Sequence, residues 1–380
     1  MKIAYLNIES PENKFAWSGL NFSIYNCLVN TGNEIVYNKS LESFKKLEIT
    51  FKRIFYKIFK NQYYEAIRDN RILEAYATEF EKFIAQEKPD LIFGAGSAHL
   101  SRIKTDIPIV FWADATFENL NEHHNYLKKL DKTTFENSKE NENSIFIKAS
   151  KLIFTSDWAI NSAISNYQID KSKLELIKFG ANIENVIVKE KVEKNIKDKK
   201  LSEIEILFIG IDWMGKDLQK VLDTTLELNN LGKKTFLHIV GSNPKIDEKY
   251  IDICKVYGFV SKHSVEGMEL LNDLFLKSHF FFMPSKAEAF GLVFAEASAY
   301  GLPSISNDVC GISSVVNNGV NGYLLQKEST SFDYANLIID LTKDETKYKE
   351  LCMSSRNEFE KELNWNIASK KLKKLLNEIK

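Results

Sequence analysis

Short apolar runs alternate with segments of helical character along most of this chain. The runs have lengths suited to buried strands and stand at residues 2–7, 91–94, 109–113, 151–155, 174–179, 204–210, 235–240, 253–260 and 279–283. Such alternation is typical of parallel sheets whose crossover connections are helices. We therefore predict an α/β protein with Rossmann-like units, in which ligands bind at the carboxyl edge of the strands.

Two such units fit the chain, since 380 residues correspond to about two domains of roughly 100–200 residues each. We expect a first unit over residues 1–184 and a second over residues 203–363. Residues 185–200 are rich in lysine and free of proline, which makes them a candidate linker or a solvated surface segment. The last segment, residues 364–380, has the pattern of an amphipathic helix.

The composition excludes several classes of protein. A formal net charge of −1 argues against a basic nucleic-acid binder. The four cysteines lack metal-ligand or disulfide spacing, so we expect neither a zinc site nor a disulfide framework. No apolar run reaches the about 18 residues of a membrane span, and Glu9 and Ser10 come too early for a signal peptide. We therefore expect a protein of the cytoplasm.

Residues 284–303, PSKAEAFGLVFAEASAYGLP, are the most informative segment for function. They place Glu288 and Glu296 eight positions apart across an expected strand-to-helix junction, with Glu288 on the loop and Glu296 in the helix. A buried carboxylate needs hydrogen-bond donors, and paired sugar hydroxyls can supply them. Glu296 is thus a candidate ligand for a ribose diol, and Glu288 for the hydroxyls of a second sugar.

The start of the same helix is a candidate phosphate site. Gly291 leaves room for a ligand against the backbone. The N–H groups of Gly291, Leu292 and Val293 have no partner within the helix and would face a phosphate between the two sugars. A sugar, a diphosphate and a ribose in a row describe a nucleotide sugar.

The pattern Pro-Ser-x-x-Glu-x-Phe-Gly-Leu-x-x-x-Glu-Ala-x-Ala-x-Gly-x-Pro resembles the Glu-x7-Glu signature of the retaining glycosyltransferases of family four. Its Phe290 joins the donor-binding segment that the family implies. The likeness covers almost the whole chain except about residues 40–86. It implies the GT-B fold, in which two Rossmann-like domains face a cleft and a C-terminal helix crosses back onto the first domain.

Lys216 follows the strand expected at residues 204–210, where a flexible ammonium could neutralise a diphosphate leaving group. Its position is similar to that of the family's basic pair that binds the phosphates. The arginine of that pair is absent, because Ile211 and Asp212 stand in its place.

The segment YGFVSK at residues 257–262 is similar to the family's base-binding loop. The resemblance implies contacts of the nucleobase with backbone groups of Gly258 and Val260. Backbone contacts leave little trace in a sequence, so the identity of the base stays open.

The acceptor side offers fewer signals. Ser18 and Gly19 open the first expected helix, where the glycine would admit a substrate phosphate or Ser18 would simply cap the helix. Asp114 ends an expected strand where many family members carry a histidine near the reacting sugar. It is a candidate base or orienting group for the acceptor hydroxyl, and equally a cap of the next helix. His123 and His124 follow and are expected to be exposed.

Residues 44–60 interleave basic and aromatic side chains at helical spacing. Such a helix could rest on anionic lipid, as a peripheral contact with the inner face of the cytoplasmic membrane. An ordinary packed helix with a solvated lysine face is the simpler interpretation.

The hypothesis that joins these signals is a retaining transfer from a nucleotide-sugar donor to a hydroxyl of a glycan, a lipid-linked sugar or a protein. The chain has no Asp-x-Asp sequence, so we expect no metal and no other cofactor. A second copy of the chain is a candidate partner in a homodimer. Two alternatives stay open, a sugar-nucleotide epimerase of the same fold and a non-catalytic nucleotide-sugar binder.

Overall fold

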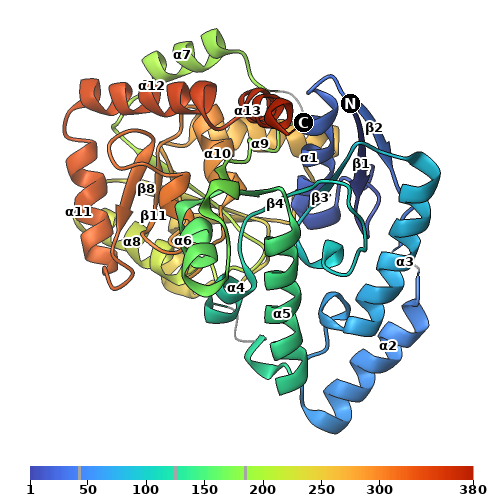
Figure 1. Cartoon of the computed structure of the whole chain (residues 1–380). Coiled ribbons are helices and arrows are strands. Elements are labelled where there is room, and N and C mark those ends of the chain that lie inside the picture. Colours follow the sequence, from blue (N-terminus) through green and yellow to red (C-terminus); the bar gives the residue numbers. More distant parts are fainter. Residues whose placement is uncertain (42–43, 124–126, 184–185, 380) are drawn as a thin grey trace. The chain divides into compact units, whose positions relative to one another are not determined.

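The computed structural model describes residues 1–380 except 42–43, 124–126, 184–185 and 380. The chain forms two compact units (Figure 1). Unit 1 consists of Met1–Lys178 and Ala368–Lys380, and unit 2 consists of Phe179–Ile367. The sequence analysis placed the two units at residues 1–184 and 203–363 and the last helix at about 364–380. The structure divides the chain after Lys178 and after Ile367, and its last helix is Trp365–Glu378.

Unit 1 is built on a parallel sheet with the strand order β2-β1-β3-β4-β5-β6. Its strands are β1 (Lys2–Leu6), β2 (Glu34–Tyr37), β3 (Leu91–Ala95), β4 (Ile109–Ala113), β5 (Lys151–Phe154) and β6 (Leu174–Leu176). Its helices are α1 (Leu20–Val29), α2 (Lys46–Phe55), α3 (Asn70–Glu87), α4 (Phe117–His123), α5 (Lys132–Lys148), α6 (Asp157–Asn166) and most of α13 (Trp365–Glu378). Every residue of the central strands β3 and β4 is buried, which explains their continuous apolar sequences.

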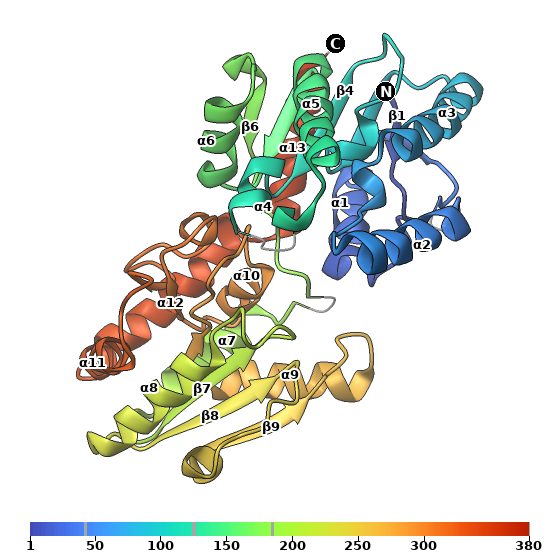
Figure 2. The same ribbon diagram turned by 90° about the horizontal axis from the view of Figure 1, so that it is seen from below.

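Unit 2 has a second parallel sheet with the order β12-β11-β10-β7-β8-β9. Three neighbouring strands of this sheet, β7, β8 and β9, are labelled in Figure 2. Its strands are β7 (Ile204–Ile209), β8 (Thr235–Val240), β9 (Cys254–Gly258), β10 (Phe280–Phe282), β11 (Ser304–Asn307) and β12 (Gly322–Leu325). Its helices are α7 (Lys189–Asp198), α8 (Leu218–Asn230), α9 (Val265–Lys277), α10 (Leu292–Ala299), α11 (Ser331–Leu341) and α12 (Glu345–Lys361). Since β10 pairs with β7, the loops that leave their carboxyl ends start side by side.

Two segments differ from the sequence prediction. The candidate linker at 185–200 contains helix α7, which buries Val192 and Ile196 and belongs to unit 2. Because these two apolar residues stand four positions apart, they lie on one face of the helix and can be buried although the rest of the helix is rich in lysine. Residues 46–60 form α2 and a π-helical turn at Tyr56–Lys60. One face of this segment packs on unit 1 as an ordinary packed helix would, but most of its apolar side chains are exposed.

Among the buried histidines, His99 in unit 1 and His279 in unit 2 are expected to make stability depend on pH. His99 in unit 1 is 2% exposed, and its Nε2 lies 3.0 Å from the carbonyl oxygen of Leu6. In unit 2, the Glu205 N–H donates to Nδ1 of His279 at 3.0 Å, and Nε2 of His279 lies 3.0 Å from the carbonyl oxygen of Lys200. Both sets of bonds suit a neutral ring. The pKa of each histidine is lowered to about 4, mainly by burial and, for His279, also by the positive charge of Lys199.

Acidification from pH 7 to pH 5 is therefore expected to lower the unfolding free energy by about 1–2 kcal/mol for each histidine. The unfolded chain binds more protons in this window, because its histidines titrate near 6.5 and the folded ones near 4. Calorimetry at the two pH values measures the effect, and the pH dependence should flatten in His279→Gln. The exposed His263, changed to Gln, is the matched control. Melting temperatures that do not fall on acidification contradict this prediction.

Candidate functional site

The loop between β10 and α10 carries the first carboxylate of the predicted pair. Glu288 lies on this loop, and Glu296 lies inside α10 with 1% of its surface exposed. Gly291 joins loop and helix in a left-handed conformation, with φ at 85°. A Cβ atom there would stand 2.6 Å from the Phe294 ring and 3.1 Å from Cγ of Glu288. The glycine is therefore needed both for the turn and for the position of Glu288.

Glu288 forms an ion pair with Lys216, which lies on the loop after β7. Their side chains are 21% and 23% exposed, so both groups are partly desolvated but reach solvent. The pair places a carboxylate that can accept sugar hydroxyls beside an ammonium that can neutralise a phosphate. The neighbouring β7 and β10 thus bring together two residues that are 72 positions apart in sequence.

Asp212, which stands where the family has an arginine, shapes the Lys216 loop. Its Oδ1 accepts the N–H of Gly215 at 3.1 Å, and its carbonyl accepts the N–H of Lys216 at 2.9 Å. A second cation of this loop region, Lys286, donates to the carbonyl of Met214 at 2.9 Å. Lys286 is 54% exposed, and the sequence interpretation did not assign it a role.

Glu296 forms an ion pair with Lys262, the last residue of the predicted base-binding loop. The carboxylate is 2% exposed and the lysine side chain is 42% exposed, so the pair joins a buried group to a solvated one. Sequence reasoning missed this contact because Lys262 precedes Glu296 by 34 positions and no local spacing relates them. The ammonium of Lys262 thereby compensates the charge of the buried carboxylate.

The backbone at the predicted base-binding loop is closely packed against the neighbouring loops. Gly258 is buried, has a φ of 70° and ends β9. Its carbonyl accepts the N–H of Gly241 at 2.8 Å. A Cβ on Gly241 would in turn stand 2.9 Å from the Gly210 backbone. The loops after β7, β8 and β9 therefore meet at one edge of the sheet, and Val260 lies partly exposed beside them.

Changing Lys262 to Met is expected to lower the unfolding free energy of unit 2 by about 1–3 kcal/mol, because it leaves the Glu296 carboxylate buried without its partner. The half-exposed lysine keeps the loss below that of a fully buried pair. Urea denaturation measures the change. Adding Glu296→Gln to this variant should recover part of the loss, since the two substitutions are coupled.

The matched control is Lys234→Met, because Lys234 is 72% exposed and pairs with a Glu203 that is 55% exposed. An exposed pair of this kind contributes about 0–1 kcal/mol. Equal stability of the two variants would show that the Lys262–Glu296 pair does not compensate a buried charge.

The predicted acceptor residues lie in unit 1, at the carboxyl edge of its sheet. Trp17, Ser18 and Gly19 have φ values of 48°, 55° and 84°, so three left-handed residues precede α1. The N-cap residue of α1 is Gly19, one position after Ser18. Left-handed conformations of non-glycine residues are strained and are concentrated at functional sites.

Asn21 in α1 anchors the strained loop. Its Nδ2 donates to the carbonyl of Ser10 at 2.9 Å, and its Oδ1 accepts from Nδ2 of Asn7 at 2.6 Å. The hydroxyl of Tyr5 also donates to that oxygen. These bonds join the end of β1 to both ends of the loop that contains Ser18.

Asp114 directly follows β4 and is partly buried. The start of the next helix, α4, is closed by Thr116 and Asn119, whose side chains accept each other's backbone N–H at 3.1 Å. The carboxylate of Glu142 accepts the N–H of Phe117 at 2.6 Å. Burial raises the pKa of Glu142. This network fixes the start of α4, directly after the loop that holds Asp114.

The remaining predicted residues add little to the site. The His123 ring lies 5.5 Å from that of Trp158 and its side chain is 33% exposed, whereas His124 lies outside the described residues. In the part of the chain that the structure describes, no group of three or more His, Cys, Asp or Glu side chains is placed to hold a metal ion.

A comparison with known families finds a match for the part of the chain that carries the two ion pairs. Residues 189–358 match the family model described as glycosyl transferases group 1. This part of the chain is therefore similar to the group 1 glycosyl transferases. The matched range contains Lys216, Lys262, Glu288 and Glu296.

One curated relative of this chain is the capsular polysaccharide biosynthesis glycosyltransferase CapM of Staphylococcus aureus. It is 24% identical over 211 residues, which cover 56% of this chain and 51% of CapM. The matches with this and other curated relatives span 39% to 53% of their lengths.

Solved structures extend the likeness to the whole chain. Sucrose-phosphate synthase from Thermosynechococcus elongatus has a TM-score of 0.71 at 17% identity, with 100% of this chain and 99% of that chain covered. Anabaena HepE, solved in complex with UDP and glucose, has a TM-score of 0.63 at 15% identity, with both chains covered completely. These likenesses show the GT-B fold of two Rossmann-like domains.

Proposed function

We propose that this chain is a retaining glycosyltransferase that moves a sugar from a nucleotide-sugar donor to a hydroxyl acceptor. The observation that carries the proposal is the pair of carboxylates in unit 2, Glu288 and Glu296, each held by a lysine near the carboxyl edge of the same sheet. In open α/β sheets this edge is where ligands bind. The group 1 family of this unit and the relative CapM support the reaction class.

The donor would lie across the loops after β7, β9 and β10. Glu296 would accept the two ribose hydroxyls, and Glu288 would accept hydroxyls of the transferred sugar. Lys216 would exchange its contact with Glu288 for the diphosphate, whose other oxygens would face the N–H groups of Gly291, Leu292 and Val293. Backbone groups of Gly258 and Val260 would contact the base. UDP in the Anabaena structure supports a nucleotide at this kind of fold.

The proposed reaction needs no protein nucleophile and no metal. The acceptor oxygen attacks the anomeric carbon from the side that the diphosphate leaves, so the new bond keeps the original configuration. The bond between that carbon and the phosphate oxygen breaks, and the departing diphosphate takes the acceptor proton. Lys216 stabilises the negative charge that develops on the diphosphate. Asp114 of unit 1 orients the acceptor hydroxyl.

We further propose a glycan, a lipid-linked sugar or a protein as the carrier of the acceptor hydroxyl, within the cytoplasm. CapM, named for capsular polysaccharide biosynthesis, supports a glycan. The strained loop of Trp17 to Gly19 and the Asp114 loop lie at the same edge of the unit 1 sheet, with only β3 between their strands.

Thermal stabilisation by nucleotide sugars tests the donor site. The protein is heated alone and with UDP-, GDP-, ADP- and CMP-sugars, because a ligand that binds only the folded state raises the melting temperature. We expect a shift for one nucleotide series, which names the base. A shift with none of the four, in the presence and absence of candidate acceptors, contradicts the proposal. Conversion of the donor without any acceptor would instead indicate an epimerase.

A further inference from the structure

The helical segment 46–60 of unit 1 exposes a row of large apolar side chains. Leu47 is 88% exposed, Phe51 70% and Ile54 51%, at positions i, i+4 and i+7 of α2. This spacing puts them on one face of an α-helix. The following π-helical turn continues the exposure with Ile58 at 67% and Phe59 at 75%. Soluble surfaces rarely carry large contiguous apolar patches without a binding role.

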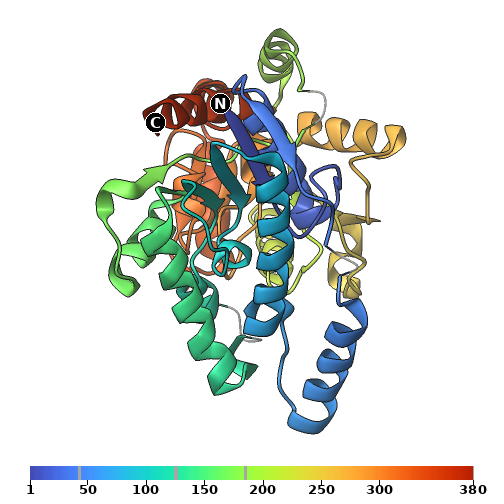
Figure 3. The same ribbon diagram turned by 45° about the vertical axis from the view of Figure 1, so that its right-hand side comes forward.

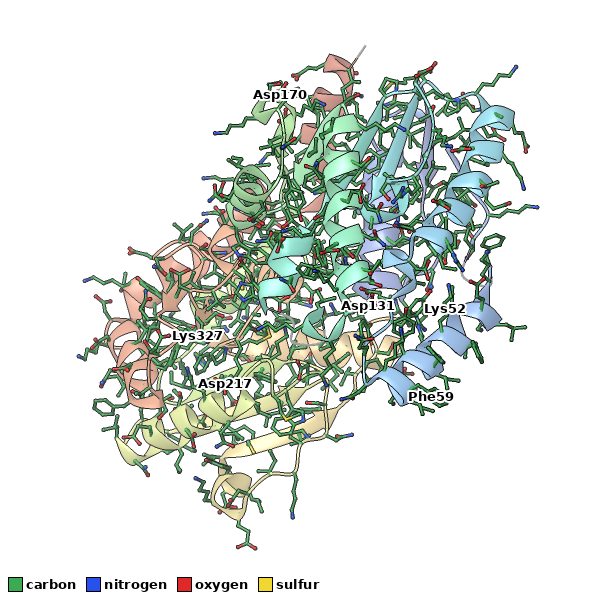
Figure 4. All side chains as sticks on the ribbon, turned by 60° about the horizontal axis from the view of Figure 1, so that its bottom comes forward. Lys52, Phe59, Asp131, Asp170, Asp217 and Lys327 are labelled. Atoms are coloured by element: carbon green, nitrogen blue, oxygen red, sulfur yellow. The ribbon has the colours of Figure 1, made fainter. Side chains whose placement is uncertain are left out.

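The opposite face of the same helix packs on unit 1. Figure 3 shows the helix in blue at the lower edge of the picture. Ile49 is 8% exposed and belongs to the unit 1 core. Lys52 donates to Asp69 at the start of α3 at 2.8 Å. The ring of Tyr56 lies 5.3 Å from that of Tyr64. In Figure 4, Phe59 lies on the outer side of this segment.

A row of positive charges runs beside the apolar row. Lys46, Arg53 and Lys57 stand at i, i+7 and i+11, are all exposed, and form no salt bridge within the described part of the chain. The acidic Glu48 is already neutralised, because Lys45 and Lys52 lie 3.4 and 3.0 Å from its oxygens. The exposed surface of the segment therefore combines apolar side chains with uncompensated cations.

We propose that this surface, formed by Leu47, Phe51, Ile54, Ile58 and Phe59 with the flanking Lys46, Arg53 and Lys57, binds the surface of an anionic lipid bilayer. The apolar row enters the boundary between headgroups and acyl chains, and the basic row contacts the anionic headgroups. The segment lies in the membrane plane. Within the described residues no helix is long and apolar enough to cross a membrane, so the contact is peripheral.

Charge distinguishes this occupant from a second copy of the chain. In a symmetric dimer each apolar row would cover the same row of its partner, and the two basic rows would approach one another. An anionic bilayer instead attracts the basic row and covers the apolar row at the same time. This proposal goes beyond glycosyl transfer and does not depend on it.

Cosedimentation of the full chain with vesicles tests the proposal. One set contains phosphatidylcholine and phosphatidylglycerol, and the other contains phosphatidylcholine alone. We expect binding to the anionic set only, weakened when salt rises from about 0.1 to about 0.5 M, because the headgroup contacts are screened. Changing Leu47, Phe51 and Phe59 to Ser should weaken the partition by about tenfold or more, as should changing Lys46, Arg53 and Lys57 to Gln.

Two matched controls in unit 1 keep the result specific. The first changes the exposed apolar residues Val29, Ile147 and Leu176 to Ser, and the second changes the exposed Lys82, Lys104 and Lys132 to Gln. Both should bind vesicles as the parent does, and circular dichroism should show that all four variants are folded.

Three results overturn the proposal. The first is equal binding to both vesicle sets, and the second is unchanged vesicle binding of the two patch variants. The third is a parent protein that does not bind vesicles but forms a dimer in light scattering, while the patch variants are monomers. Turnover of a water-soluble acceptor should be equal in parent and patch variants. A loss of vesicle binding with normal turnover therefore separates this proposal from the proposed reaction.

Discussion

Replacing Glu288 with alanine is expected to reduce sugar transfer by about 10³-fold or more, because it removes both the acceptor of the sugar hydroxyls and the partner that positions Lys216. The fold should survive, since both side chains reach solvent and Lys216 can hydrate its ammonium. The loss should appear mainly in kcat. Steady-state rates with the donor identified by thermal stabilisation measure it.

Two further variants make the Glu288 result specific. Glu288→Gln keeps the size and one acceptor oxygen but cannot form the ion pair, so its activity should lie between those of the parent and the alanine variant. Glu328→Gln changes an exposed glutamate of the same unit and should leave the rate unchanged. Near-normal turnover of a folded Glu288→Ala protein would remove Glu288 from the reaction.

Glu296→Gln is expected to weaken donor binding by about 10²-fold, since hydrogen bonds to a charged acceptor contribute about 1.5–3 kcal/mol each and the ribose offers two hydroxyls. The carboxylate lies in an almost solvent-free position, which strengthens these bonds. Lys262 is half-exposed and can turn to water, so the substituted protein should fold. Calorimetric titration with the nucleoside diphosphate measures the affinity.

The control for this prediction lies at the other edge of the same sheet. Glu203 immediately precedes β7 and is 55% exposed, so Glu203→Gln should bind the nucleotide as the parent does. A nucleotide lacking the ribose 2′-hydroxyl should lose part of its affinity for the parent but little for Glu296→Gln. Unchanged affinity of a folded Glu296→Gln protein would place the ribose elsewhere.

Local signals made much of the fold and part of the site predictable. Buried parallel strands are short continuous apolar runs, so the strands around β4 and β7 were visible in the sequence. The junction at Gly291 was also visible, because a strand, a glycine and an apolar helix follow one another within about twenty residues. Both Glu288 and Glu296 could therefore be assigned to their elements before any coordinates were known.

The partners of the two glutamates could not be predicted in the same way. Lys216 was chosen by its position after a strand, but its contact with Glu288 requires that β7 and β10 be neighbours, which the chain order does not reveal. The contact between Lys262 and Glu296 likewise depends on the fold of unit 2. Asp212 shapes the Lys216 loop by accepting the N–H of Gly215, and the residue types alone do not determine the geometry of this turn.

Segment 46–60 shows a different limit. Its periodic pattern predicted a helix correctly, but periodicity cannot tell which face of a helix is covered. One face of the segment packs on unit 1 through the ion pair of Lys52 and the contact between the rings of Tyr56 and Tyr64. The more apolar face is left exposed. Burial there follows from long-range packing, which no local pattern contains.

Product analysis after transfer tests the central claim most directly. The protein is incubated with the nucleotide sugar that stabilises it and with candidate hydroxyl acceptors, and the anomeric configuration of the product is read by NMR. The account predicts an acceptor-dependent glycoside with the configuration of the donor, formed without added metal and lost in Glu288→Ala. A product of inverted configuration, or turnover only in the presence of a divalent metal, would contradict it.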